Sequence, residues 1–221
     1  MPTYKYFAQP IKNVLTNQTI LYELLLRQWH EAQQTWGIPI DFELTPAAVI
    51  QLLDVAVKEL KYHNVSINLT QKQFANPVMQ RDLNAYVTEN LLPRQLTIEL
   101  VSTPDLAVLK AMSRDYRSAG VLIAFDDVGS DNLLADIAPM LPYANTIKFA
   151  LQNSRQIGQA NLKTAVSELR FWFEKAEAEQ MLFTFEGIET AADLQLAHNL
   201  RITRGQGYLF AKPQLPVTFN D

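Results

Sequence analysis

The chain has 221 residues, of which 48% are hydrophobic and 19% are charged, and this composition excludes disorder as its main state. The absence of cysteine excludes disulfide bonds, thiolate zinc sites and cysteine nucleophiles. A net charge of −4 gives no basic field that would attract DNA or RNA, and no apolar run approaches the length of a membrane span. The first residues lack the layout of a signal peptide, so we expect a single cytoplasmic domain over residues 1–221.

Short runs rich in β-branched and aromatic residues recur along the chain and predict eight strands. In chain order they cover residues 5–9, 19–27, 65–69, 96–101, 121–128, 146–150, 181–188 and about 202–210. The link between the first two runs is too short for a parallel crossover, so we expect this pair to be antiparallel. The later runs are separated by longer segments and should be parallel.

Helical spacing of apolar residues marks two of the longer segments, residues 46–63 and 161–180. Helix starts are marked by Thr45-Pro46, by Thr103-Pro104-Asp105 and by Thr190, each of which offers an N-cap residue. The alternation of strands and helices predicts an α/β fold, a TIM-like (β/α)8 barrel with one antiparallel strand. An open doubly wound sheet is the alternative, but the segment Gly205-Gln206-Gly207 is too short and misplaced to be the glycine-rich phosphate-binding loop of that fold.

Polar residues stand where the predicted strands end, and in such barrels these ends form the active site. Each acid alone could be a solvated loop residue, and the lysine could extend to solvent, but clustered acids repel one another and require a positive partner. Carboxylate and amide oxygens suit Mg²⁺ or Mn²⁺, whereas the histidines (His30, His63 and His198) fall in predicted helical or linking segments and indicate no zinc site. The residues at the strand ends are Glu23, Asn68, Glu99, Asp126, Asp127, Lys148, Glu186, Glu189 and Gln206.

At these positions the sequence resembles the EAL domain family, the phosphodiesterases that hydrolyse the bacterial second messenger cyclic di-GMP. Seven segments correspond in order to the family motifs E-A-L-L-R, V-N-L-S, E-I-T-E, D-D-F-G-T, L-K-I, E-G-V-E-T and Q-G-Y-L-F. They are E-L-L-L-R from Glu23, S-I-N-L-T from Ser66, I-E-L-V from Ile98, F-D-D-V-G-S from Phe125, I-K-F from Ile147, E-G-I-E-T from Glu186 and G-Q-G-Y-L-F from Gly205.

The resemblance implies two-metal hydrolysis of cyclic di-GMP to linear pGpG, with Mg²⁺ or Mn²⁺ as cofactor. It implies that one ion is held by Glu23, Asn68, Glu99 and Asp126, and the other by Asp126, Asp127 and Glu186. The implied catalytic residues are Lys148, which would orient and help to activate the attacking water, Glu186 and Glu189. The implied substrate-binding residues are Arg27, which would contact a phosphate, Gln206 and Leu25.

Several positions depart from the family pattern. Ser102 stands in place of a glutamate that braces the active-site loop, and Asp131 replaces the second glycine of that loop, residues 128–134. Phe185 replaces a small residue, so it should narrow the pocket rim or stack on a base. Only 21 residues lie between Pro46 and Asn68, which predicts that one barrel helix is missing or merged.

These departures leave more than one function open. The favoured hypothesis is an active cyclic di-GMP phosphodiesterase. The alternatives are a catalytically weak or inactive cyclic di-GMP receptor or protein-interaction module on the same fold, and an unrelated metal-dependent barrel enzyme. A homodimer through the active-site loop and the adjacent helix, and a regulatory protein partner, are further expectations.

Overall fold

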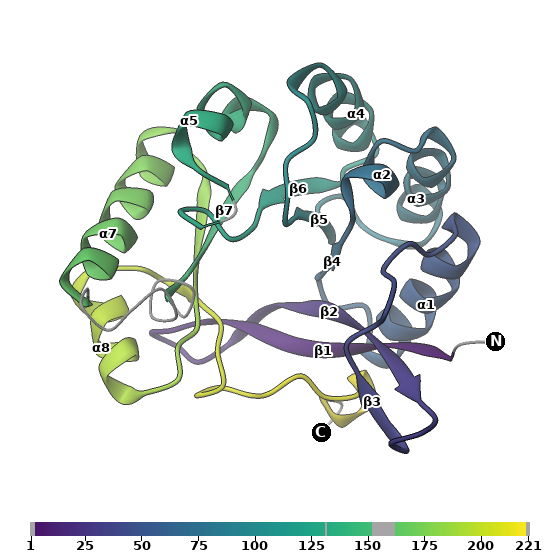
Figure 1. Ribbon diagram of the computed structural model, residues 1–221, viewed down its shortest axis with the longest axis horizontal. Coiled ribbons are helices and arrows are strands. Elements are labelled where there is room, and N and C mark those ends of the chain that lie inside the picture. Colours follow the sequence, from purple (N-terminus) through teal and green to yellow (C-terminus); the bar gives the residue numbers. More distant parts are fainter. Residues whose placement is uncertain (1–2, 131, 152–161, 220–221) are drawn as a thin grey trace.

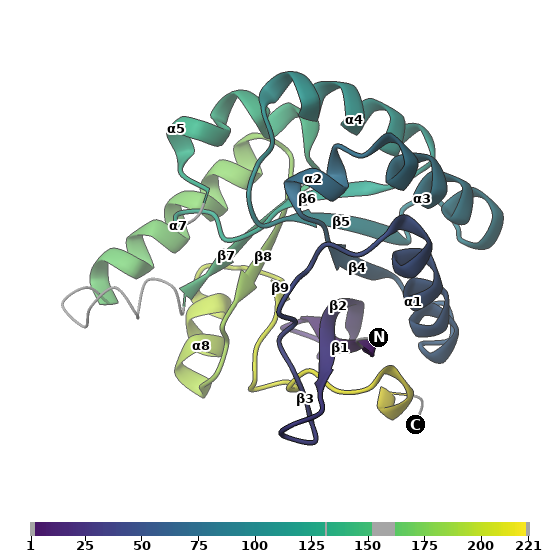
Figure 2. The same cartoon turned by 45° about the vertical axis from the view of Figure 1, so that its right-hand side comes forward.

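The computed structural model describes residues 3–130, 132–151 and 162–219, which form a closed barrel of strands with helices outside it (Figure 1). The barrel strands are β1 (Tyr4–Asn13), β2 (Thr19–His30), β4 (Val65–Asn68), β5 (Leu96–Leu100), β6 (Leu122–Phe125), β7 (Thr146–Ala150), β8 (Leu182–Glu186) and β9 (Arg204–Gly205). A ninth strand, β3 (Thr35–Gly37), pairs only with the end of β2, and this hairpin projects away from the barrel (Figure 2).

The ring of strands is closed by β1. The sheet order is β1-β9-β8-β7-β6-β5-β4-β2-β3, and β1 also pairs with β2, which joins the two sides of the ring. β1 is antiparallel to both β2 and β9, whereas all pairs from β2 through β4 to β9 are parallel. The expected TIM-like barrel with one antiparallel strand is therefore confirmed.

Helices connect the parallel strands and cover the outside of the barrel (Figures 1 and 2). They are α1 (Pro46–Glu59), α2 (Gln71–Phe74), α3 (Pro77–Asn90), α4 (Leu106–Ser118), α5 (Leu134–Ile137) with the 3-10 turn η1 (Ala138–Tyr143), α7 (Leu162–Ala178) and α8 (Ala191–Asn199). A last 3-10 turn, η3, covers Pro216–Phe219. Among the described residues, none of these helices has the length and apolar character needed to cross a membrane.

The helix starts agree with the capping residues in the sequence. The Thr45 hydroxyl accepts a hydrogen bond from the backbone of Ala48, and Thr190 forms a capping box with Asp193. Asp105 is the N-cap of α4, but its side chain makes no capping hydrogen bond. Every parallel crossover in the described part of the chain carries a helix, and α1 is the helix between Pro46 and Asn68. The loss or merging of a further helix that the family usually has there stays a prediction.

The structure corrects two strand boundaries, adds one strand and relocates one histidine. The last predicted strand shrinks to the two residues of β9, and the predicted strand 121–128 ends at Phe125, since the chain turns at Asp127, whose φ is 48°. β3 was missed because three residues show no usable alternation. His30 lies in β2 and not in a helical or linking segment; its ring nitrogen is 3.0 Å from the carbonyl oxygen of Ile38.

Alternation along the strands separates an apolar outer face from a polar inner face. On β5, Leu96, Ile98 and Leu100 are fully buried in the core between barrel and helices. Glu99 is buried as well, but it contacts Lys148 of β7 across the barrel. The barrel interior around Glu99 and Lys148 therefore contains ionisable side chains, and the site described below lies there.

We predict that Gly207→Ala destabilises the protein by about 2–4 kcal/mol, because a Cβ at this position would overlap the backbone of Ile188, which has no room to move. Gly37→Ala is the matched control, since its Cβ would meet only the ring of His30, and that side chain can rotate away with the loss of one exposed hydrogen bond to Ile38 O. Urea unfolding of both variants measures the difference. Equal stability of the two variants would contradict the prediction.

Candidate active site

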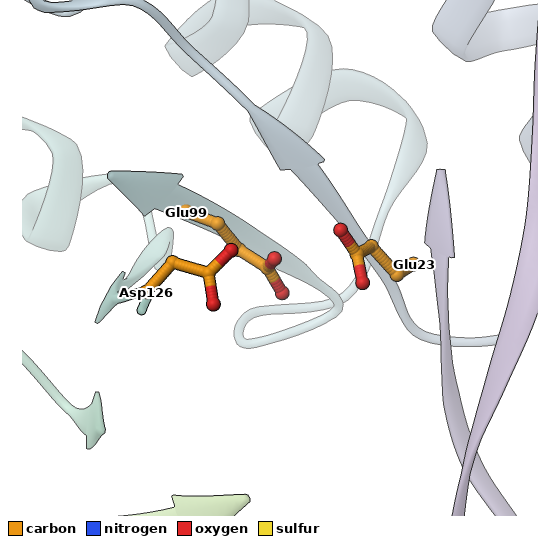
Figure 3. Close-up of side chains that lie close together, drawn as sticks. All are labelled: Glu23, Glu99 and Asp126. Atoms are coloured by element: carbon orange, nitrogen blue, oxygen red, sulfur yellow. The ribbon is translucent and has the colours of Figure 1, made fainter. Parts of the chain in front are cut away.

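Four acids from four different strands meet at the C-terminal end of the barrel. Glu23 belongs to β2, Glu99 to β5 and Glu186 to the end of β8, and Asp126 follows β6 directly. Figure 3 shows Glu23, Glu99 and Asp126 extending into the barrel, and one oxygen of each lies within 4.8 Å of the others. Asp126, Asp127 and Glu186 form a second such group, so Asp126 belongs to both. Neither group includes a histidine.

Lys148 occupies the centre of these acids. Its Nζ lies 2.5 Å from Glu99, 2.8 Å from Glu186, 3.3 Å from Asp126 and 3.4 Å from Glu23. The side chain is only 1% exposed, so it does not extend to solvent. Burial lowers its pKa, but the four carboxylates outweigh burial and raise the pKa well above its ordinary value. Lys148 is therefore a buried ammonium that balances part of the negative charge.

Two side-chain amides hold the Glu23 carboxylate from either side. Asn68 Nδ2 donates to Glu23 Oε1 at 2.8 Å, and Gln206 Nε2 donates to Glu23 Oε2 at 2.7 Å. The carbonyl oxygens of both amides, Asn68 Oδ1 and Gln206 Oε1, are buried and have no hydrogen-bond partner among the described residues. Such an oxygen carries a desolvation cost unless it accepts a hydrogen bond from a donor or coordinates a cation. Asn68 Oδ1 beside carboxylate oxygens thus fits an oxygen-ligated divalent metal.

Burial and mutual repulsion shift the protonation of the acids. Burial and the neighbouring Glu23 raise the pKa of Glu99 to about 8, although Lys148 opposes this. Burial and Asp126 raise the pKa of Glu186 well above its ordinary value. At Glu23 burial also raises the pKa, but Lys148 and the two amides outweigh it, so the pKa is lowered. The site therefore contains more negative charge than one lysine can balance, which is the condition that a divalent cation relieves.

Two adjoining cavities open above the acids. One, of about 430 Å³, is polar and lined by Asp127, Glu186, Glu189, Gln206 and Tyr208 among others. The other, of about 540 Å³, is largely apolar and includes Leu26, Ile38, Phe42, Leu44 and Leu69. Glu23, Leu25, Arg27 and Asp126 line both. The arrangement provides a continuous cleft for a ligand that combines anionic groups with flat apolar groups.

Comparison with known proteins identifies the family. The family model of the EAL domain matches residues 3–213. This chain belongs to the EAL domain family.

A curated relative and two solved structures show how far the similarity extends. The "probable cyclic di-GMP phosphodiesterase PdeD" of Escherichia coli (strain K12) is 26% identical over 226 residues, which cover 95% of this chain and 41% of that protein. The EAL enzyme Bd1971, solved with cAMP and cyclic di-GMP, superposes with a TM-score of 0.80 at 20% identity, over 98% of this chain and 63% of that chain. The YkuI protein of Bacillus subtilis, solved with cyclic di-GMP and calcium, gives a TM-score of 0.75 at 17% identity, over 96% of this chain and 56% of that chain. The chain thus spans less than half the length of the curated relative, and the two structures support the fold.

Most of the site residues expected for an EAL domain lie together. Arg27 and Leu25 line both cavities, and Asp127 lies beside Asp126, whose Oδ1 accepts a hydrogen bond from the Asp127 backbone at 3.0 Å. Glu189 differs, because it is exposed at the rim of the polar cavity and belongs to neither group of close acids.

Phe185 is the clearest correction among the departures from the EAL pattern. It is fully buried on the outer face of β8, so it neither narrows the rim nor stacks on a base. Ser102 is exposed and lines the apolar cavity. Asp131 lies outside the described residues.

Two residues of this EAL domain site escaped the sequence analysis. Gln9 pairs with Glu23 across β1 and β2, and its Oε1 is 3.3 Å from Gln206 Nε2. Asn132 is buried behind the two aspartates, where its side chain donates to Asp126 O. Gln9 could have been found from the register of the first hairpin, but nothing in the sequence indicates which way the Asn132 amide points.

The raised pKa of Glu99 predicts how the metal-free EAL domain responds to pH. In the unfolded chain this carboxyl loses its proton near 4.5, and in the folded protein it keeps it until about 8, so the folded state binds more protons in this window. The free energy of unfolding therefore falls as pH rises through the window. We expect Glu99→Gln to reduce this slope, without abolishing it, because Glu186 acts in the same direction.

The measurement is thermal or urea unfolding across the window in the presence of a chelator. Glu89→Gln, an exposed acid in α3, is the matched control and should leave the slope unchanged. A slope in Glu99→Gln identical to that of the wild type would show that Glu99 titrates normally.

Proposed function

We propose that this EAL domain hydrolyses cyclic di-GMP to linear pGpG with two Mg²⁺ or Mn²⁺ ions. The observation that carries the proposal is Asp126, which belongs to two overlapping groups of acids whose ligand oxygens lie within 4.8 Å of one another. The relative from Escherichia coli, named a probable cyclic di-GMP phosphodiesterase, supports the same substrate.

The residues divide into two ligand sets in this proposal. Glu23, Asn68, Glu99 and Asp126 hold one ion, and Asp126, Asp127 and Glu186 hold the other. When bound, the ions polarise the phosphodiester, lower the pKa of water and stabilise the leaving oxygen. The buried oxygen of Asn68 completes an all-oxygen set, which suits Mg²⁺ and Mn²⁺.

Lys148 orients the reacting groups in this scheme. Its raised pKa keeps it protonated, so it donates hydrogen bonds to the carboxylates and to a water between them rather than removing a proton. Glu186 contacts Lys148 Nζ at 2.8 Å, and we assign it a catalytic role beside its place in the second ligand set. Glu189 at the rim is assigned a supporting role on the substrate side of the cleft.

The cleft accounts for a cyclic dinucleotide as substrate. Arg27 is half-buried and lines both cavities, and we assign its guanidinium the contact with a phosphate. Gln206 and Leu25 complete this part of the cleft, and the apolar cavity beside them is suited to a purine base. Phosphate contacts and base contacts are thus available on either side of the acids.

A cyclic di-GMP receptor with little turnover is the second candidate. Ser102 supplies no carboxylate at the position where the family pattern has one, and small misplacement of a reacting group lowers the rate more than the affinity. The homodimer through the active-site loop, the regulatory partner, the single-domain organisation and the cytoplasmic location stay predictions from the sequence.

Incubation with cyclic di-GMP and Mn²⁺, followed by separation of the nucleotides, tests the proposal. We expect pGpG from the wild type, a loss of at least about 100-fold in rate for Glu23→Ala, and the wild-type rate for the control Glu89→Ala. Ca²⁺ should bind without supporting turnover, because its larger and looser coordination orients water poorly. If cyclic di-GMP binds in a metal-dependent manner but is not hydrolysed, the protein is a cyclic di-GMP receptor and the proposed hydrolysis is refuted.

Metal binding should also be visible without substrate. A ligand that binds only the folded state raises its stability, by about 2.7 kcal/mol when present at 100 times its dissociation constant. We expect Mn²⁺ or Mg²⁺ to raise the Tm of the wild type and of Glu89→Ala, and to leave Glu23→Ala nearly unchanged. A wild type that shows no shift in millimolar metal contradicts the two-metal assignment.

A further inference from the structure

The segment that follows β6 is fixed to both neighbouring strands. The backbone N–H of Asp126 donates to Leu100 O of β5 at 3.0 Å, and the N–H of Val128 donates to Lys148 O of β7 at 3.1 Å. Between these two anchors, Asp127 has a positive φ of 48°, in the left-handed region that is uncommon for non-glycine residues and that Asp adopts more readily than most. The two aspartates of the candidate metal site thus lie on a short, constrained turn.

Asn132 ties this turn together from behind. Its side chain is 2% exposed, and its Nδ2 donates to Val101 O at 2.8 Å and to Asp126 O at 2.5 Å. Its backbone N–H donates to Asp127 O at 3.3 Å, and its carbonyl oxygen accepts from Gly129 N–H at 3.0 Å. One residue therefore contacts the carbonyl groups of both aspartates and the end of β5.

The amide also ties the turn to the segment that follows β5. The backbone of Asp126 pairs with Leu100 O, and Val101 comes directly after the end of β5. Asn132 Nδ2 supplies the hydrogen-bond donor for Val101 O, so it links this segment to the carbonyl of Asp126. Both hydrogens of the NH₂ group are used, and no charged or hydroxyl side chain of similar shape provides two donors.

We propose that Asn132 is a positioning residue that holds Asp126 and Asp127 in the geometry that both ligand sets require. The proposal deepens the proposed function and rests on it for its consequences in catalysis. At Ser102 no carboxylate is present to hold the active-site loop, residues 128–134. Asn132, which belongs to this loop, supplies hydrogen bonds that hold it instead. Groups that orient metal ligands typically affect metal affinity or activity by about 10- to 100-fold.

The test compares Asn132→Leu, which keeps the size but removes both donors, with Asn84→Leu as matched control. Asn84 Nδ2 donates to Asp115 O at 3.0 Å between α3 and α4, so its loss removes the same kind of hydrogen bond away from the site. Amide hydrogen exchange of the metal-free proteins is measured first. We expect exchange at Asp126 and Val128 to be at least about 10-fold faster in Asn132→Leu and unchanged in Asn84→Leu.

Metal affinity and kinetics are measured next. In Asn132→Leu we expect Mn²⁺ to bind about 10-fold or more weakly and kcat for cyclic di-GMP to fall about 10- to 100-fold, with KM within about 3-fold. Asn84→Leu should match the wild type in Mn²⁺ affinity, kcat and KM. If Asn132→Leu does not fold, Asn132→Ser, which keeps one donor, replaces it and should show the same changes to a smaller extent.

Wild-type amide exchange at Asp126 and Val128 in the folded Asn132 variant would overturn the proposal. So would wild-type Mn²⁺ affinity combined with wild-type kcat. A wild-type protein that binds Mn²⁺ but leaves cyclic di-GMP intact would refute the proposed function alone, since exchange and Mn²⁺ affinity still report on Asn132.

Discussion

The structure of the barrel interior depends on one buried ammonium group among four carboxylates. Lys148 contacts Glu23, Glu99, Asp126 and Glu186, and no other cation contacts these acids among the ion pairs of the described residues. A single positive charge reduces the repulsion between the acids but does not neutralise them. The repulsion that remains, together with burial, raises the pKa values of Glu99 and Glu186. The cluster of acids that metal binding requires therefore lowers the stability of the metal-free protein.

Neutral hydrogen-bond donors surround this charged centre and fix its geometry. Asn68 and Gln206 hold both oxygens of Glu23, and Asn132 holds the backbone of Asp126 from the opposite side. Amides are suited to this task because they orient a carboxylate without adding charge. The barrel strands bring the acids together, and the side-chain amides fix the orientation of Glu23 and of the turn that follows β6.

The sequence predicts the fold and the acids well because both follow from periodic features. Alternating strands and helices indicate the barrel, and carboxylates placed after strands meet at one end of it, as Glu99 and Asp126 do. Phe185 was misjudged because its neighbour Glu186 faces the cleft, and adjacent residues of a strand face opposite sides. Gln9 and Asn132 were missed because their roles depend on cross-strand register and on the direction of a side chain, which local patterns do not encode.

The inverted strand β1 has a consequence for folding. It pairs with β2 through a local hairpin, but it meets β9 only at Lys12–Gly205 and Asn13–Arg204, so the ring closes through two residue pairs from opposite ends of the chain. The Gln206–Glu23 hydrogen bond, which spans 183 residues, forms at the same seam. Contacts this distant in sequence carry a large loop-closure entropy and form late. During synthesis the carboxylate of Glu23 therefore gains its second amide only after Gln206 has left the ribosome, long after Glu23 itself.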